Sequence, residues 1–231
     1  MINGRLKADV CFTGKVIILD SGSVMSRDNC RIKNALIQKD LSCLPACALE
    51  RQIHCVRKAR ETLKQEYNPA VVPKEVVKEV QKHLEFFRNN SKFKYNGLIR
   101  NYIEELDNFQ RECAGFDPRI DGLLNCRVSH INPSHTYYSN TLEHYRSEVE
   151  RRHASKNQNS SEADIAIATL TYLLHHEGYP DPCIITRDND FACLVPPTRE
   201  HIRCHTEEYM ESTIYNVATS SFRFKMYISK Y

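Results

Sequence analysis

The chain has 231 residues, of which 41% are hydrophobic and 26% charged, so it is long enough to bury the core of one large domain. Its formal net charge of +3 at pH 7 allows a polyanionic partner but does not demand one, because the positive excess is small. The longest apolar run, residues 165–174, is too short to span a bilayer, and the sequence therefore indicates no membrane role.

Ten cysteines would suggest disulfide bonds in a secreted protein, but residues 1–7 lack the apolar core of a signal peptide. We therefore expect an intracellular, reducing compartment, either cytoplasm or nucleus. Two groups of Cys and His residues have irregular spacing, so a zinc site stays open beside the interpretation as ordinary buried thiols. The groups are Cys43, Cys47, His54 and Cys55, and His201, Cys204 and His205.

The first part of the chain predicts strands that alternate with helices. Residues 15–19 form a continuous aliphatic run ending at Asp20, as expected of a strand buried on both faces of a parallel sheet. Residues 31–64 then show broken helical periodicity, and residues 70–73 predict a second short strand. A helix over residues 74–87 follows, because a proline suits its first turn and apolar residues recur along one face.

The later part of the chain continues this alternation. Its predicted elements are helices over residues 98–113, 141–153 and 162–176 and strands over residues 124–131, 183–186 and 221–229. The helix over 162–176 is apolar almost all round, so it should be buried. Together the elements predict an α/β domain with a mostly parallel central sheet and helices on both of its faces.

Carboxylates follow the predicted buried strands or stand beside them. Asp20 and Asp188 each follow such a strand, Asp164 lies in the first turn of a buried helix, and a further acid, Glu79, follows the short strand. Ligands of parallel sheets bind beyond the carboxyl ends of the strands, so we expect these acids to converge on one groove. Clustered carboxylates raise one another's pKa unless a hard divalent cation balances their charge. The pattern therefore predicts a Mg²⁺ or Mn²⁺ site.

Each acid also has a purely structural interpretation. Residues 161–164 match the capping box, in which Ser161 caps the helix and Asp164 reaches back to it. The segment 188–190 fits a turn in which Asx side chains bond their own backbone. Glu75 and Glu85 compete with Glu79 for the inward position on their helix.

Four segments resemble the PIN-domain nuclease family in content and order, and the resemblance covers most of the chain. The segments are residues 17–21, 71–80, 163–168 and 185–191. The resemblance implies one three-layer α/β/α domain over residues 1–231. Because the spacing from Glu79 to Asp164 is long for a compact member of the family, it also implies a helical insertion around residues 88–125 that narrows the groove or meets a protein partner.

What the resemblance implies for function is an endoribonuclease that cleaves single-stranded RNA with Mg²⁺ or Mn²⁺. The residues that match the family's catalytic acids are Asp20, Glu79, Asp164 and Asp188, and the metal ligands would be Asp20, Asp164, Asp188 and Asp190. Ser21 and Thr186 would hydrogen-bond these carboxylates and fix their rotamers. The ions would activate a water and neutralise charge on the leaving oxygen.

Substrate phosphates would need cations at the mouth of the groove. The candidates are Arg146, Arg151, Arg152 and Lys156 on one side and Arg57, Lys58 and Arg60 on the other. Two other functions stay open: a non-catalytic PIN-fold module that binds RNA or scaffolds a larger RNA-processing complex, and a structure-specific DNA nuclease. Homodimerisation also stays open.

Overall fold

A computed structural model of the chain describes most of its predicted elements. It covers residues 16–25, 28–38, 46–64, 70–90, 96–113, 161–176, 182–187, 191, 209–216 and 221–229, together with 143, 146–147, 150–151 and 154. The strand predicted over 124–131 lies outside the described residues, and so do Asp188, Asp190, Arg152 and Lys156.

Five strands form one sheet in the order β2-β1-β3-β4-β5. The strands are β1 (Ile17–Leu19), β2 (Ala70–Val71), β3 (Cys183–Thr186), β4 (Tyr209–Asn216) and β5 (Ser221–Ser229). The first three pairs along this order are parallel and the last, β4 with β5, is antiparallel. The predicted α/β class with a mostly parallel sheet is thus confirmed.

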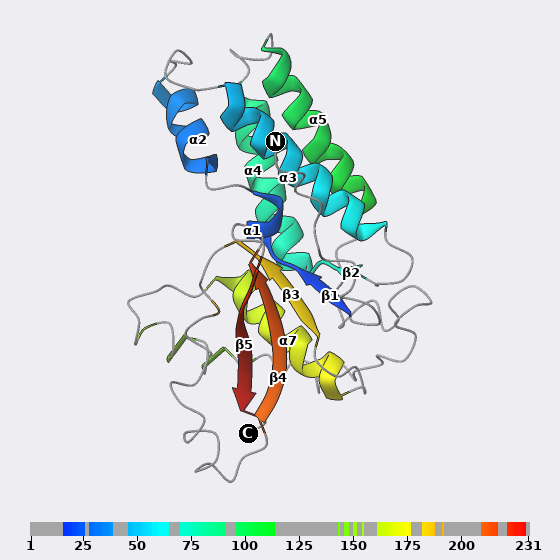
Figure 1. The fold of residues 1–231 in the computed structure, drawn as a ribbon. Coiled ribbons are helices and arrows are strands. Elements are labelled where there is room, and N and C mark those ends of the chain that lie inside the picture. Colours follow the sequence, from blue (N-terminus) through cyan, green and yellow to red (C-terminus); the bar gives the residue numbers. More distant parts are fainter. Residues whose placement is uncertain are drawn as a thin grey trace.

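In the described part of the chain, most helices form a group at one end of the sheet, and α7 (Glu162–His176) lies alongside the sheet (Figure 1). The helices are α1 (Ser21–Val24), α2 (Asn29–Gln38), α3 (Ala46–Leu63), α4 (Lys74–Asn89), α5 (Gly97–Glu112) and α7 (Glu162–His176). Figure 1 shows α2 to α5 packed together beyond the end of the sheet where α1 begins, whereas α7 runs along the strands. Contacts of α7 with α4 and β4 join the two parts.

Helix α5 falls within the stretch where the sequence predicts an insertion. It packs against both α3 and α4, so it belongs to the helical group rather than standing apart from it. Its buried stripe includes Ile99, Tyr102, Leu106 and Phe109, spaced three or four residues apart as one face of a helix requires.

The core is continuous from the sheet into the helical group. All three residues of β1 and all four of β3 are buried, as expected of aliphatic strands covered on both faces. In α4, Val76, Val80 and Leu84 recur at helical spacing and are buried without exposed area. Within the described part of the chain, no helix is long and apolar enough to cross a membrane.

Candidate functional site

Asp20 lies at the carboxyl end of β1, at the point where the chain enters α1. Its backbone N–H donates to the carbonyl oxygen of Ile185 at 3.0 Å, which joins this point to β3. Its carboxylate accepts a hydrogen bond from the hydroxyl of Thr186 at 2.6 Å and one from the backbone N–H of Gly22 at 3.2 Å. The side chain therefore caps α1 and is also held by β3 through Thr186, and the residue is only 4% exposed.

Asp164 lies in the first turn of α7 and is also buried. Its backbone N–H donates to the Ser161 hydroxyl oxygen at 3.0 Å, and its carboxylate accepts from the Ser161 backbone N–H at 2.9 Å. This reciprocal pair is the capping box that the sequence predicts, with an aspartate in the place of the usual glutamate. The helix N-terminus also favours the ionised carboxylate.

Glu79, on α4, lies near Asp164. Ser21 and Ser161, the residues at the N-termini of α1 and α7, lie near its carboxylate. Burial raises the pKa of Glu79, and the negative charge of Asp164 raises it further, while the two serines oppose these effects. Its competitor Glu85 is exposed on the same helix. Glu79 is therefore a half-buried acid that shares its surroundings with Asp164.

The three acids and their hydroxyl partners form one connected group, which we call the acidic site. It consists of Asp20, Ser21, Glu79, Ser161, Asp164 and Thr186. The Ser21 hydroxyl donates to Asp20 at 3.4 Å and also lies near Glu79, whose pKa it lowers. The site lies where α1, α4 and α7 meet the carboxyl ends of β1 and β3, the edge at which parallel sheets bind ligands.

The donor set fits a hard cation in its chemistry. All three acids present carboxylate oxygens, the ligands preferred by Mg²⁺ and Mn²⁺, and a cation would relieve the repulsion between Glu79 and Asp164. As placed, no three His, Cys, Asp or Glu side chains in the described ranges are close enough together to hold a metal ion. The two further predicted acids, Asp188 and Asp190, follow β3 outside those ranges.

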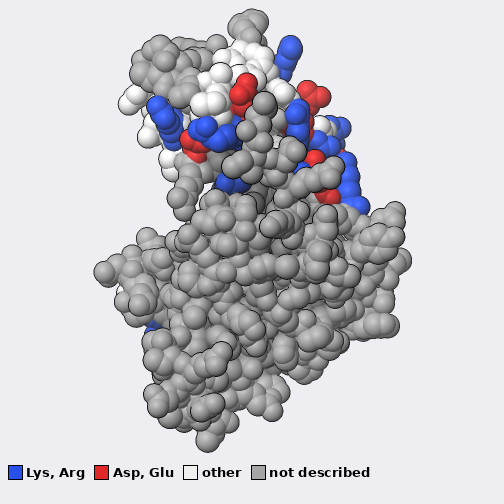
Figure 2. All heavy atoms as spheres, viewed as in Figure 1, with Lys and Arg blue, Asp and Glu red and all other residues white. Residues whose placement is uncertain are grey.

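The arginines predicted to bind phosphate are engaged in ion pairs wherever the structure describes their partners. Arg146 makes two hydrogen bonds to the Glu162 carboxylate, at 2.7 and 2.9 Å. Arg57 and Arg60, on α3, both bind Glu105 of α5. Figure 2 shows the resulting pattern over the helical group, where Lys and Arg stand next to Asp and Glu.

A second basic group, not anticipated from the sequence, lies beside the acidic site. Arg51 of α3 binds Asp28 with its Nε 2.8 Å from Oδ2, and Arg187, directly after β3, donates to the Cys55 thiol sulfur at 2.8 Å. The bond to Arg51 lowers the pKa of Asp28, and the charges of Arg31 and Arg187 lower it further. We call Asp28, Arg31, Arg51 and Arg187 the arginine cluster. Its signal in the sequence is the position of Arg187 immediately after Thr186.

The described members of the two Cys and His groups give little support to a zinc site. Cys55 is buried and accepts a hydrogen bond from Arg187, while its neighbour His54 is exposed on the helix. Cys47 is exposed and lies near Arg51. Cys43, His201, Cys204 and His205 lie outside the described residues.

Comparisons of the chain with protein-family models, with curated proteins and with solved structures find no match.

Proposed function

We propose that this protein is a metal-dependent endoribonuclease of the PIN-like type, which cleaves single-stranded RNA at the acidic site. The observation that carries the proposal is the position of Glu79 between Ser21 and Ser161, because it draws together acids from three separate segments of the chain. Asp20 comes from the end of β1, Glu79 from α4 and Asp164 from α7. Such a convergence at the carboxyl edge of a parallel sheet is typical of a reaction centre.

The electrostatics of Glu79 support a cation at this position. Burial and a second carboxylate raise the pKa of Glu79, so its ionised form is destabilised in the folded protein. A raised pKa of this kind is common at functional sites. Asp20, Glu79 and Asp164 would hold Mg²⁺ or Mn²⁺, with Asp188 and Asp190 completing the ligand set. Bound there, the ion supplies a water of lowered pKa and neutralises charge on the leaving oxygen.

The remaining residues of the acidic site orient the ligands. Thr186 donates to one oxygen of Asp20, and this bond fixes the carboxylate rotamer from the neighbouring strand. The Ser161 hydroxyl oxygen accepts a hydrogen bond from the backbone N–H of Asp164, which leaves its own proton available to an acceptor.

The proposal is tested by incubating the full-length protein with end-labelled single-stranded RNA and Mn²⁺ or Mg²⁺, with EDTA in a parallel reaction. Glu79→Gln keeps the shape of the side chain and removes its charge, so we expect cleavage to fall at least about 100-fold. Glu85→Gln is the matched control, because Glu85 is exposed on the same helix, and it should cleave like the wild type. Far-UV circular dichroism checks that both variants are folded.

The outcomes separate the competing functions. Cleavage that persists in Glu79→Gln or in EDTA would remove the acidic site as the reaction centre. RNA binding without cleavage in either metal would favour the non-catalytic module. That function is compatible with the structural roles of Asp20 and Asp164, which hydrogen-bond to backbone N–H groups at the N-termini of α1 and α7. Faster cleavage of branched DNA than of single-stranded RNA would indicate the DNA nuclease.

A further inference from the structure

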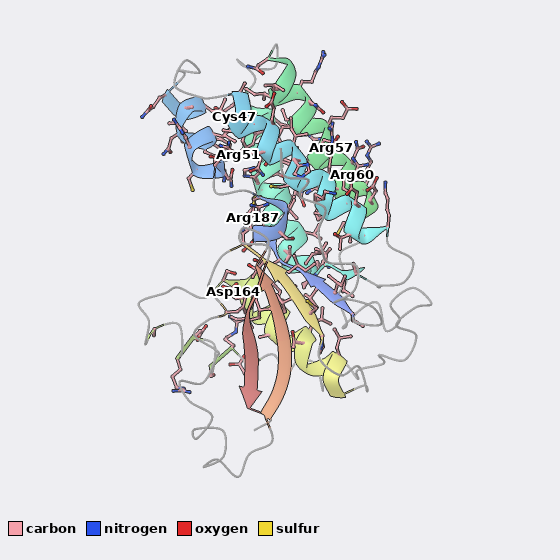
Figure 3. All side chains as sticks on the ribbon, viewed as in Figure 1. Cys47, Arg51, Arg57, Arg60, Asp164 and Arg187 are labelled. Carbon is pink, nitrogen blue, oxygen red and sulfur yellow. The ribbon has the colours of Figure 1, made fainter. Side chains whose placement is uncertain are left out.

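The arginine cluster and the acidic site are joined through consecutive residues of one strand end. Thr186 donates to Asp20 in the acidic site, and the next residue, Arg187, contacts Cys55 on α3. In the view of Figure 3, Arg187 lies between Asp164 and Arg51. Arg187 therefore follows directly on a residue of the acidic site and extends from there to α3.

Helix α3 extends this basic surface away from the sheet. Arg51 and Cys55 are four residues apart, so they stand on one face of α3 about one turn from each other. Arg51 is exposed, and Arg31 is exposed on α2. The arginines thus form a short path from the carboxyl edge of the sheet along α3 toward solvent.

The charge of the cluster favours an anion. Three guanidinium groups act on a single carboxylate, that of Asp28, whose pKa they lower. Elsewhere on α3 and directly after its last residue, two acids of α5 face three cations: Arg57 and Arg60 share Glu105, and Arg60 and Lys64 share Glu112. The four residues of the arginine cluster, three arginines and Asp28, thus carry two more positive charges than negative ones.

We propose that Arg31, Arg51 and Arg187 bind backbone phosphates of a single-stranded RNA next to the nucleotide held at the acidic site. The inference rests on the proposed nuclease function and extends it to substrate binding. Guanidinium groups suit this role, because their planar forks match phosphate oxygens. Asp28 holds Arg51 in position and competes with the phosphates for it.

The test measures binding separately from cleavage, by fluorescence anisotropy of a labelled single-stranded RNA in EDTA. Arg51→Gln should weaken binding by about fivefold at moderate salt. Each arginine that contacts a phosphate adds about 0.7 to the slope of log affinity against log salt concentration, so Arg31→Gln with Arg51→Gln should lower this slope by about 1.4. Asp28→Asn should tighten binding, because it removes the competing negative charge.

Arg88→Gln is the control for Arg51→Gln. Both arginines are exposed, and both bind an aspartate, Arg88 with Asp107 at 2.5 Å. Wild-type affinity in Arg88→Gln with reduced affinity in Arg51→Gln would establish the arginine cluster. Equal weakening in both variants, or no RNA binding by the wild type, would overturn it.

The same variants distinguish this inference from the proposed function. If the wild type cleaves RNA while Arg31→Gln and Arg51→Gln bind like the wild type, the nuclease stands and the phosphate subsite fails. If the arginines control binding but neither Mg²⁺ nor Mn²⁺ supports cleavage, the subsite stands and the nuclease fails. Thermal unfolding of each variant confirms that the comparison is made between folded proteins.

Discussion

Ser21 and Ser161 each stand at the N-terminus of a helix and each contact Glu79. Each serine also has a role in its own helix: Ser21 is the first residue of α1 and donates to Asp20, and Ser161 caps α7. A capping residue therefore also positions an acid from a different element. The arrangement explains how an acid on α4 comes to share its surroundings with Asp164.

The raised pKa of Glu79 predicts a stability cost in the absence of a cation. An acid whose folded pKa lies above its unfolded value favours the folded state most at low pH, and this advantage is lost as the pH rises through the folded pKa. Without divalent ions, Glu79→Gln should therefore unfold at higher urea concentration than the wild type at pH 7. The difference in urea midpoint between Glu79→Gln and the wild type should shrink as the pH falls toward 4.5.

Urea unfolding in EDTA at several pH values checks this expectation. Glu85→Gln, on the exposed part of α4, should follow the wild type at every pH. A Glu79→Gln variant that is less stable than the wild type at pH 7 would contradict the account, because it would mean that the charged form is favoured by its surroundings.

At the scale of elements, a buried polar chain joins three helices. The ring nitrogen Nε2 of His83, on α4, lies 2.6 Å from the hydroxyl oxygen of Tyr102 on α5, and Gln52 of α3 donates to the same oxygen at 3.0 Å. All three side chains are buried. Burial, with a smaller effect of the Lys33 charge, lowers the pKa of His83 to about 3. The folded protein thus holds this imidazole neutral.

The lowered pKa of His83 predicts that the helical group becomes less stable as the pH falls. The unfolded chain protonates His83 near pH 6.5, so its contribution to stability is complete above that pH and is lost as the pH falls toward 3. The cost is about 1.4 kcal/mol in the free energy of unfolding per pH unit. His83→Gln keeps a polar partner for Tyr102 but does not titrate, so its stability should depend less on pH.

Urea midpoints between pH 7 and pH 4.5 measure this difference. His54→Gln, exposed on α3, should retain the pH dependence of the wild type. The same slope in His83→Gln and the wild type would show that His83 does not determine acid sensitivity.

Ion pairs between α3 and α5 hold the outer face of the helical group together. Glu105 is 8% exposed and binds both Arg57 and Arg60, and the Arg60 side chain is itself only 18% exposed. Glu105→Ala leaves Arg60 with Glu112 as its partner and should lower the free energy of unfolding by about 1 to 2 kcal/mol. The neighbouring Glu104 is exposed, so Glu104→Ala should change it by less than about 0.5 kcal/mol.

Chemical denaturation of the two alanine variants makes the comparison directly. If both substitutions cost the same, the position of Glu105 between two arginines contributes nothing beyond helix propensity.

At the scale of the whole molecule, the elements with a strong local pattern were predictable. The aliphatic run of β1, the valine stripe of α4 and the apolar helix α7 occur where the sequence predicts them. The region over residues 31–64 forms two helices, α2 and α3, which accounts for its broken periodicity. Strand β4 was missed, because its residues do not alternate cleanly and its pairing with β3 and β5 supplies the reason for its conformation.

The candidate site also has a part that the sequence predicts and a part that it does not. The approach of Asp20 to Thr186 follows from strand ends that meet at one edge of a parallel sheet. The arginine cluster could not be derived, because Arg51 and Asp28 are 23 residues apart and meet only through the packing of α3. Local patterns thus predict which residues end an element, and packing decides which charges meet.

The central claim is that Asp20, Glu79 and Asp164 act as one binding site for a divalent cation. Calorimetric titration of Mn²⁺ into the full-length, RNA-free protein tests it most directly. We expect the wild type and Glu85→Gln to bind Mn²⁺ alike, and Asp20→Asn and Glu79→Gln to bind it at least about tenfold more weakly. Equal Mn²⁺ affinity in all four proteins, or no binding by the folded wild type, would contradict the claim.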